Sequence, residues 1–268
     1  MNRYLLALAL PLLSLCIGCD VVGETGRSRF LLFSDTQMNK MAIDAYAEET
    51  GKYPVITGTK DARMVQDVGE RIAKACGRNY AWEFKLLDAP KVVNAFALPG
   101  GKIAIYSGIL KVTKDEHGLA TVMGHEVAHA TARHGAERMT DTTIAKLGLG
   151  AAALVLEGWD KESEETKGMV MTGLGLAGKG TLQKFSRTHE SEADTIGLEY
   201  MMRAGYDPEA APKLWERMAK LSAGKGPGML ESFFASHPPS LERAAALRKL
   251  IPILRQKLAD EKTGSARE

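Results

Sequence analysis

Hydrophobic and polar positions follow two different periods along the chain, and these periods predict two kinds of element. Trp82, Phe84 and Leu86 alternate with charged residues, which is typical of a half-buried strand. Apolar runs at 92–97 and 103–106, joined by a Pro-Gly-Gly turn, predict two further strands of a small sheet. Apolar residues at helical spacing, bounded by capping residues and glycine, predict helices over 35–50, 59–76, 208–222 and 241–260. We therefore expect a mainly helical α+β fold.

A further helix is predicted to begin at a capping pair formed by Thr113 and Glu116. It contains the run His-Glu-Val-Ala-His, in which His125 and His129 are four residues apart and Glu126 follows the first. Side chains at positions i and i+4 share one face of a helix, so both imidazoles can bind one metal ion while the carboxylate approaches the water that the metal binds. The spacing predicts a hydrolytic zinc site in outline.

A catalytic zinc usually has three protein ligands, so a third ligand must come from elsewhere in the chain. His134 follows His129 by five residues and is expected on the far, solvent-facing side of the helix. Glu190 and Asp194 form a second i, i+4 pair. An acidic run by itself is usually a solvated face. Beside two histidines, one carboxylate can bind the metal while the other accepts the free N–H of a ligating imidazole. Gly124, which lowers helix stability by about 1 kcal/mol relative to Ala, favours a close packing contact just before the motif.

Four segments of the chain resemble one peptidase family, and they occur in the family's order. They are Asn-Ala-Phe-Ala-Leu-Pro-Gly-Gly at 94–101, the motif at 125–129, the segment 186–194, and Ser-His-Pro-Pro at 236–239. Over residues 35–250 the chain is similar to the gluzincin zinc peptidases typified by HtpX and the CAAX prenyl protease, including their bacterial lipoprotein members. The resemblance implies a zincin-type peptidase domain at 35–268, with the small β-sheet beside the metal-binding helix.

The resemblance also implies a role for each residue of the site. His125, His129 and Glu190 would bind one Zn²⁺ per chain, and Glu126 would act as the general base. Asp194 would position a ligand from outside the coordination sphere. Zinc, as opposed to another divalent ion, is inferred from the His-His-Glu set.

Two more residues are candidates for stabilising the oxyanion that develops during peptide hydrolysis. The resemblance places His237 at the site, where it would either stabilise the tetrahedral intermediate or cap zinc in a latent state. A loop position before the helix cap Ser240 is its alternative. Arg187 is the second candidate, and a salt bridge that positions the site carboxylates is its alternative role.

Substrate binding is expected at a strand beside the metal helix. By resemblance, an edge strand formed by Asn94, Ala95, Phe96 and Ala97 would pair with the backbone of an extended polypeptide, which requires no particular sequence. An ordinary internal strand of the core is the alternative interpretation of the same residues.

The function predicted from these observations is that of a zinc-dependent endopeptidase acting on misfolded or membrane-associated envelope proteins. One alternative is a latent zinc-binding chaperone or quality-control binding protein with little turnover. Another is an enzyme for prenyl-like or lipidated substrates, which the lack of a pattern of multiple spans disfavours. The net charge of +2 and the scattered basic residues argue against a nucleic-acid partner.

Two features between the histidine motif and the third ligand need an interpretation. The run at 173–178 fits GxGxxG, but no strand precedes it, so no nucleotide cofactor is expected. The apolar stretches 147–156 and 169–177 fall well short of the roughly 20 residues of a membrane span. They are predicted to be buried helices or a flap over the site.

The N-terminus has the pattern of an export signal. Asn2 and Arg3 precede an apolar run at 4–15, which is too short for a comfortable membrane span, so residues 1–18 are expected to be a signal peptide. Cys19 is then the expected lipidation site, at the start of a tether over 19–34. Cys16 stands where lipoprotein signals usually carry Leu, and a simple cleaved signal and an uncleaved anchor are the alternatives. We expect a membrane-anchored lipoprotein of the bacterial envelope that faces the periplasm.

Overall fold

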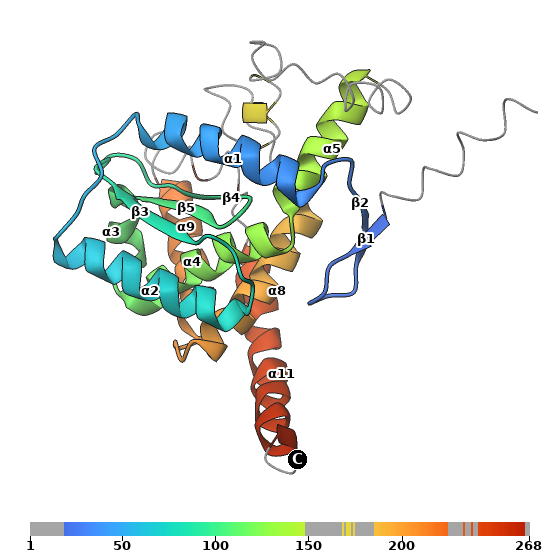
Figure 1. Cartoon of the computed structure of the whole chain (residues 1–268). Coiled ribbons are helices and arrows are strands. Elements are labelled where there is room, and N and C mark those ends of the chain that lie inside the picture. Colours follow the sequence, from blue (N-terminus) through green and yellow to red (C-terminus); the bar gives the residue numbers. More distant parts are fainter. Residues whose placement is uncertain are drawn as a thin grey trace, which may run out of the picture.

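Helices dominate the computed structural model, and a small sheet accompanies them, which confirms the predicted α+β class (Figure 1). The described residues are 19–147, 168, 170–172, 174, 185–224, 233, 237 and 241–265. The signal peptide predicted at 1–18 lies outside them, as do nearly all of the run 173–178 and most of the apolar stretches 147–156 and 169–177. Within the described part, no helix has the length and apolar character needed to cross a membrane.

The first two helices begin and end close to where the sequence predicts. α1 (Asp35–Thr50) is closed by Gly51. α2 (Lys60–Cys76) begins at Thr59, whose hydroxyl accepts a backbone N–H of the first turn, and ends at Gly77 in the left-handed conformation with φ of 68°. Local capping chemistry therefore sets the limits of both helices.

The three-stranded sheet separates two groups of core side chains. β3 (Glu83–Leu87) pairs in parallel with β5 (Lys102–Tyr106), and β5 pairs antiparallel with β4 (Ala95–Leu98), so the order is β3-β5-β4. Because alternate residues point to opposite faces, one face packs on α2 and α4, and the other packs on α1 (Figure 1). All three predicted strands are confirmed, and β4 lies at an edge of this sheet.

α4 (Glu116–Thr131), which carries the histidine motif, is the central helix of the fold. It packs against α2, β4, α8 (Arg187–Arg203) and α9 (Ala210–Gly224), and its residues from 118 to 131 are all buried. After α4 the chain turns at Arg133, which has a left-handed φ of 54°, and continues as α5 (His134–Leu147). The motif therefore lies on a buried stretch of the central helix.

The start of α4 differs from the prediction. η2 (Ser107–Ile109) leads into α3 (Leu110–Thr113), so Thr113 ends the preceding helix. Asp115 is the N-cap of α4, and its carboxylate accepts the N–H of Gly118 at 2.8 Å. The predicted capping pair of Thr113 and Glu116 is wrong. Lys114 has a positive φ of 71°, which ends α3 and makes Asp115 the N-cap of α4.

The C-terminal helices match the prediction apart from their ends. α9 begins at Ala210, two residues later than expected, and α11 (Leu241–Ser265) extends beyond residue 260. α11 packs on α8 and α9 with its first turns and then projects from the body (Figure 1). Its N-terminal turns lie close to the metal-binding helix.

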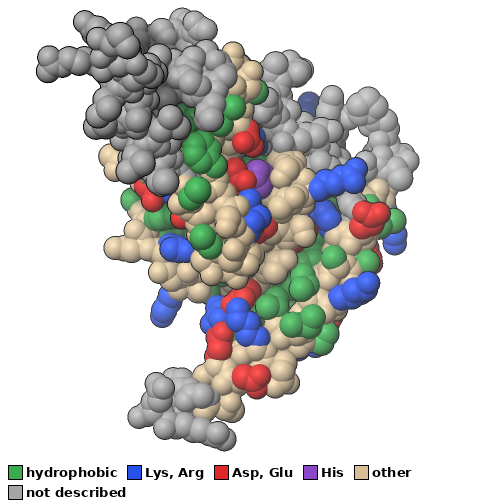
Figure 2. All heavy atoms as spheres, turned by 90° about the vertical axis from the view of Figure 1, so that its right-hand side faces the viewer, with side chains coloured by type: hydrophobic (Ala, Val, Ile, Leu, Met, Phe, Trp, Pro, Cys, Tyr) green, Lys and Arg blue, Asp and Glu red, His purple; other side chains and the backbone are tan. Residues whose placement is uncertain are grey.

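The segment 19–34, predicted as a tether, is folded onto the body. β1 (Cys19–Val21) and β2 (Ser28–Phe30) form an antiparallel hairpin. Val22 is buried in the main core, and the Arg29 guanidinium donates to the carbonyl of Ala132 at the end of α4. Figure 2 shows the side of the molecule that carries this hairpin, with acidic and basic side chains interspersed. Val22, Leu31 and Phe33 of this segment are buried, and Arg27 and Arg29 pair with acidic side chains, so the segment packs on the body.

Candidate metal centre

Two imidazoles lie together on the face of α4 that is turned toward α8. The Nε2 atoms of His125 and His129 are 3.0 Å apart, and each residue is 2% exposed. α4 and α8 approach each other closely at Gly124 and Gly197, which is the close packing that the sequence predicts for the first of these glycines. The i, i+4 spacing and this close approach bring both rings to the start of α8.

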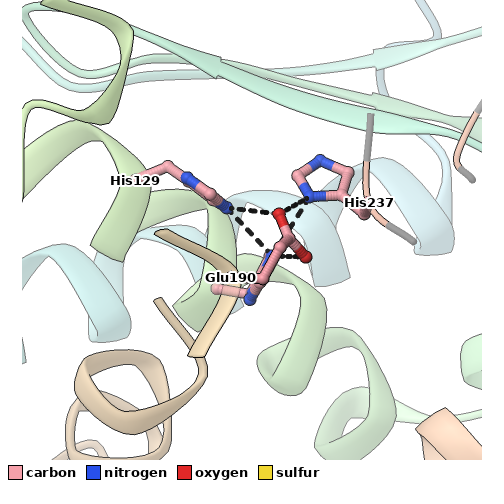
Figure 3. Close-up of side chains that lie close together, drawn as sticks. His129, Glu190 and His237 are labelled. Atoms are coloured by element: carbon pink, nitrogen blue, oxygen red, sulfur yellow. Dashed lines mark hydrogen bonds and ion pairs between the residues drawn. The ribbon is translucent and has the colours of Figure 1, made fainter. Parts of the chain in front are cut away.

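Glu190 lies in the first turn of α8, opposite the two histidines. Ser186 caps this helix by accepting the N–H of His189. The Oε1 atom of Glu190 is 3.5 Å from Nε2 of His129 (Figure 3). Its Oε2 atom is 3.6 Å from Nε2 of His125. The capped helix start therefore directs a carboxylate at both imidazoles.

His237 completes the cluster from a distant part of the sequence. Its Nδ1 atom is 2.9 Å from Oε1 of Glu190 (Figure 3). The same atom is 3.2 Å from Nε2 of His125. Each of four residues offers one potential ligand atom, and these atoms all lie within 4.8 Å of one another: His125, His129, Glu190 and His237. All four residues are buried. Three imidazoles and a carboxylate are donors that zinc prefers, so the site could hold one metal ion.

Glu126 lies beside this cluster with one oxygen unsatisfied. Its Oε1 atom is buried and has no hydrogen-bond partner among the described residues. The Nε2 atom of His237 lies 3.5 Å away from it. A buried carboxylate oxygen without a partner is costly, and a water molecule held beside the cluster would satisfy it. The donor set and this orphaned oxygen both fit a bound metal with a water ligand.

The charges around Glu190 keep its carboxylate ionised. Burial would raise the pKa of Glu190, but the charge of His237 and the hydrogen bond to His129 outweigh it, so this pKa lies well below its ordinary value. Burial lowers the pKa of His129 well below its usual range. Burial would also lower the pKa of His237, yet the charges of Glu190 and Glu126 raise it. Binding of a metal by all four groups would displace the proton of His237.

Asp194 supports the first histidine from behind, as the i, i+4 carboxylate pair predicts. Its Oδ1 atom lies 3.1 Å from Nδ1 of His125, so the carboxylate can accept that N–H and leave Nε2 free to bind a metal. The ion pair with Arg243 overcomes the effect of burial and lowers the pKa of Asp194. The residue is thus an ionised acceptor outside the cluster.

Arg243, at the start of α11, pairs with both Glu190 and Asp194 of α8. Its guanidinium donates to the two oxygens of Asp194 at 2.6 and 2.7 Å and lies 2.7 Å from Oε2 of Glu190. Arg187, the arginine that the sequence offered for this region, is exposed at the first position of α8 and is not brought to the cluster. No motif marks Arg243, because its contact depends on the docking of a distant helix.

His134 is buried, contrary to the expectation of a surface residue. Its Nδ1 atom lies 2.9 Å from Nδ1 of His129, and its exposure is 0%. The prediction was wrong because it extended α4 past its end. The left-handed turn at Arg133 redirects the chain and returns His134 to the back of the metal cluster.

The predicted substrate strand lies where the sheet ends. Ala95, Phe96 and Ala97 belong to β4, which pairs with β5 on one side, and Asn94 precedes it. Ala95 and Phe96 are buried in the core, whereas Ala97 is half-buried and lines a pocket together with His129. The edge position of the strand is confirmed, and its pairing with a substrate stays a prediction.

A mainly helical fold in which two buried histidines of an HExxH helix meet a glutamate of a second helix defines a zincin-type metallopeptidase. The sequence model of the family "Peptidase family M48" matches residues 59–251. The chain therefore belongs to peptidase family M48. The donor set and the family agree on zinc as the metal.

The chain is similar to several characterised proteases. It is 36% identical over 239 residues to the "Mitochondrial metalloendopeptidase OMA1" of Schizosaccharomyces pombe, covering 87% of this chain and 66% of that protein. The corresponding protein of Saccharomyces cerevisiae is 35% identical over 174 residues, which cover 64% of this chain and 47% of that protein. The "Beta-barrel assembly-enhancing protease" of Escherichia coli is 26% identical over 230 residues, covering 83% of this chain and 44% of that protein. The chain thus spans less than two thirds of the length of each of these relatives.

Proposed function

We propose that this chain is a zinc-dependent endopeptidase. The observation that carries the proposal is the buried cluster of His125, His129 and Glu190 with the unsatisfied oxygen of Glu126 beside it. The three ligands would leave one position for water, and the glutamate stands where it can receive that water's proton. The similar proteins described above are all proteases by name, which supports the same chemistry.

The side chains of the site have distinct roles in this proposal. When bound, Zn²⁺ would lower the pKa of a water molecule and polarise the scissile carbonyl. Glu126 would accept the proton of the attacking water and deliver it to the leaving amine. Asp194 and Arg243 would hold the ligands in place, and the buried walls would exclude bulk water. His237 would either stabilise the oxyanion or occupy the open position of the metal.

Polypeptides in extended conformation are the proposed substrates. The edge of β4, formed by residues 95–98, could pair with a substrate backbone next to the pocket that Ala97 and His129 line. Peptides with N-methyl groups at alternate backbone positions near the scissile bond should then bind more weakly than unmodified peptides, by about tenfold in KM. A KM that stays unchanged whichever set of alternate positions carries the N-methyl groups would contradict strand pairing.

We infer an envelope location with a lipid anchor at Cys19. This residue is exposed at the start of the hairpin, so an attached lipid would point away from the folded body. Labelled fatty acid should be incorporated into the wild type and Cys76→Ser but not into Cys19→Ser. Equal labelling of wild type and Cys19→Ser would refute lipidation there. Misfolded or membrane-associated envelope proteins are the proposed targets, and assignment to the HtpX and CAAX-protease branch stays a prediction.

A second candidate function is a latent zinc protein with little turnover. The observation that favours it is the position of His237, whose Nδ1 atom lies among the potential ligand atoms. A fourth protein ligand would close the coordination sphere that hydrolysis requires to be open. Such a protein would bind its clients without cleaving them.

One paired experiment separates these functions. Zinc content and cleavage of unfolded casein are measured for the full chain as wild type, Glu126→Gln and the exposed control Glu48→Gln. We expect equal zinc in all three and cleavage by the wild type and the control alone, with a loss of at least about a thousandfold for Glu126→Gln. Equal zinc with no cleavage by any form would favour the latent protein. A wild type that binds no zinc would contradict both the endopeptidase and the latent zinc protein.

A further inference from the structure

His129, the second histidine of the motif, is supported by a longer series of contacts than His125. Nδ1 of His129 lies 2.9 Å from Nδ1 of His134, and Nε2 of His134 lies 2.9 Å from Oε2 of Glu192. Both histidines and the carboxylate are buried. The chain therefore runs from a potential metal ligand, through a second imidazole, to an acid on α8.

One arrangement of protons on the ring nitrogens is consistent with all of these contacts. With Nε2 of His129 directed at the metal cluster, its Nδ1 carries the proton and donates to Nδ1 of His134. His134 then carries its own proton on Nε2 and donates it to Glu192. Burial lowers the pKa of His134 to about 4, in keeping with a neutral ring. The arrangement resembles a carboxylate–histidine–metal triad extended by one imidazole.

Arg27 of the N-terminal hairpin binds Glu192, the last residue in this series of contacts. Its Nε and Nη2 atoms donate to Oε2 of Glu192 at 2.9 and 2.8 Å. Its Nη1 and Nη2 atoms also form a bidentate pair with Glu137 at 2.8 and 2.7 Å. Glu137 in turn lies 3.2 Å from Nε2 of His189, whose ring stacks on His134 with centroids 4.6 Å apart. The guanidinium of Arg27 thus binds the carboxylate that accepts from His134. Through Glu137 it also supports the His189 ring that stacks on His134.

We propose that Arg27, Glu192 and His134 are positioning residues of the metal centre, and that they hold the imidazole of His129 in the orientation that binds the metal. The N-terminal hairpin then helps to set the geometry of the metal site through Arg27. The arrangement mirrors the one at the other end of the chain, where Arg243 supports His125 through Asp194. The proposal rests on the proposed function only in taking His129 as a ligand.

The test measures zinc affinity by competition with a chromophoric chelator, using the full chain in detergent. Arg27→Gln and His134→Leu are compared with the wild type and with Arg78→Gln, which removes a different contact to the same hairpin, the 3.3 Å pair with Glu24. We expect zinc affinity to fall about 10- to 100-fold in the first two variants and to stay within about twofold in the control.

Two further variants separate positioning from simple stabilisation. His134→Asn retains an acceptor near the Nδ1 position and should recover part of the affinity that His134→Leu loses. The double variant of Arg27→Gln and His134→Leu should bind zinc about as weakly as His134→Leu alone, because the two residues act in series. Additive losses would contradict a serial chain.

The thermal midpoint of each metal-free variant is recorded in parallel. A lower midpoint with unchanged zinc affinity in both Arg27→Gln and His134→Leu would show that the network is only structural and would overturn the proposal. A wild type that binds zinc without cleaving casein would refute the proposed endopeptidase function, and the affinity comparison would still decide the positioning role. The two failures are thus distinguishable.

Discussion

Gly124 on α4 and Gly197 on α8 touch through their backbones. A Cβ atom added to Gly124 would lie 2.7 Å from the carbonyl oxygen of Gly197, and one added to Gly197 would lie 2.7 Å from the carbonyl carbon of Gly124. His125 follows the first glycine directly, and Asp194 lies one turn before the second. The close approach of two helices without side chains at the crossing therefore sets the separation between the histidines and the acids.

Replacing either glycine by alanine should separate the two helices. The obstacle is backbone, which cannot rotate away, so Gly197→Ala should destabilise the fold by about 1–3 kcal/mol. It should also weaken zinc binding by about tenfold, because the ligands come from both helices. Gly135→Ala is the control, since its added Cβ would meet its nearest neighbour at 3.8 Å, an ordinary contact. Urea unfolding and chelator competition measure both effects, and unchanged zinc affinity in a folded Gly197→Ala would contradict the argument.

Arg243 should stabilise the metal-free protein more than the zinc-loaded one. It is the guanidinium that pairs with Glu190 and Asp194, so Arg243→Gln leaves two buried carboxylates in the metal-free state without that partner. Removing one partner of a buried ion pair costs about 3–5 kcal/mol. A bound zinc ion replaces part of the lost positive charge, so zinc should recover part of the stability.

Thermal unfolding with and without zinc checks this prediction. Arg187→Gln, at an exposed position of the same helix α8, serves as the control and should unfold like the wild type. Arg243→Lys keeps the charge and provides a second variant if Arg243→Gln does not fold. Equal destabilisation of the metal-free and zinc-loaded forms of the Arg243 variants would show that the arginine has no electrostatic link to the metal.

Local features of this protein could be predicted from the sequence. The alternation at Trp82–Leu86 and the glycine after α2 identified a strand and a helix end, because both depend on nearest neighbours. The i, i+4 spacing of His125 and His129 placed two imidazoles on one face for the same reason. The same argument failed at Thr113, where one left-handed residue moved the cap by two positions.

Contacts made by distant segments could not be predicted in this way. His134 lies behind His129 only because the chain turns at Arg133, and helical periodicity cannot register such a turn. Arg27 and Arg243 reach the site from opposite ends of the chain through tertiary packing. Paired charges that contact across the fold leave no spacing signal in a single sequence, so these positioning residues become visible only in the structure.

His237 is predicted to restrain the enzyme. Its Nδ1 atom lies 3.2 Å from Nε2 of His125 and 2.9 Å from Glu190, within the group of potential ligand atoms. His237→Ala should therefore open one position of the metal and raise the rate of casein cleavage about fivefold or more, at equal zinc content. His237→Gln, which fills the space with a weaker ligand, should lie between the two. A large loss of kcat with zinc retained would instead show that His237 stabilises the transition state.

The ion pair between α8 and α11 should make stability depend on pH in the acid range. Burial would raise the pKa of Glu199, but its hydrogen bonds to Lys257 and Arg203 lower it below the ordinary value of 4.5. The Nζ atom of Lys257 lies 2.8 Å from its Oε2 atom and the guanidinium of Arg203 lies 2.7 Å from its Oε1 atom. A carboxylate whose pKa is lowered by folding stabilises the native state above its unfolded pKa, and this contribution is lost as the pH falls through the folded pKa.

Glu199→Gln should therefore reduce the free energy of unfolding by about 1 kcal/mol at pH 7 and have almost no effect near pH 2. Glu216→Gln, which removes an exposed pair with Arg248, is the matched control and should change stability little at either pH. Urea unfolding of the metal-free protein at both pH values measures the difference. An equal loss at pH 7 and pH 2 would mean that Glu199 acts through packing, because a contribution from its charge must disappear once the carboxylate is protonated.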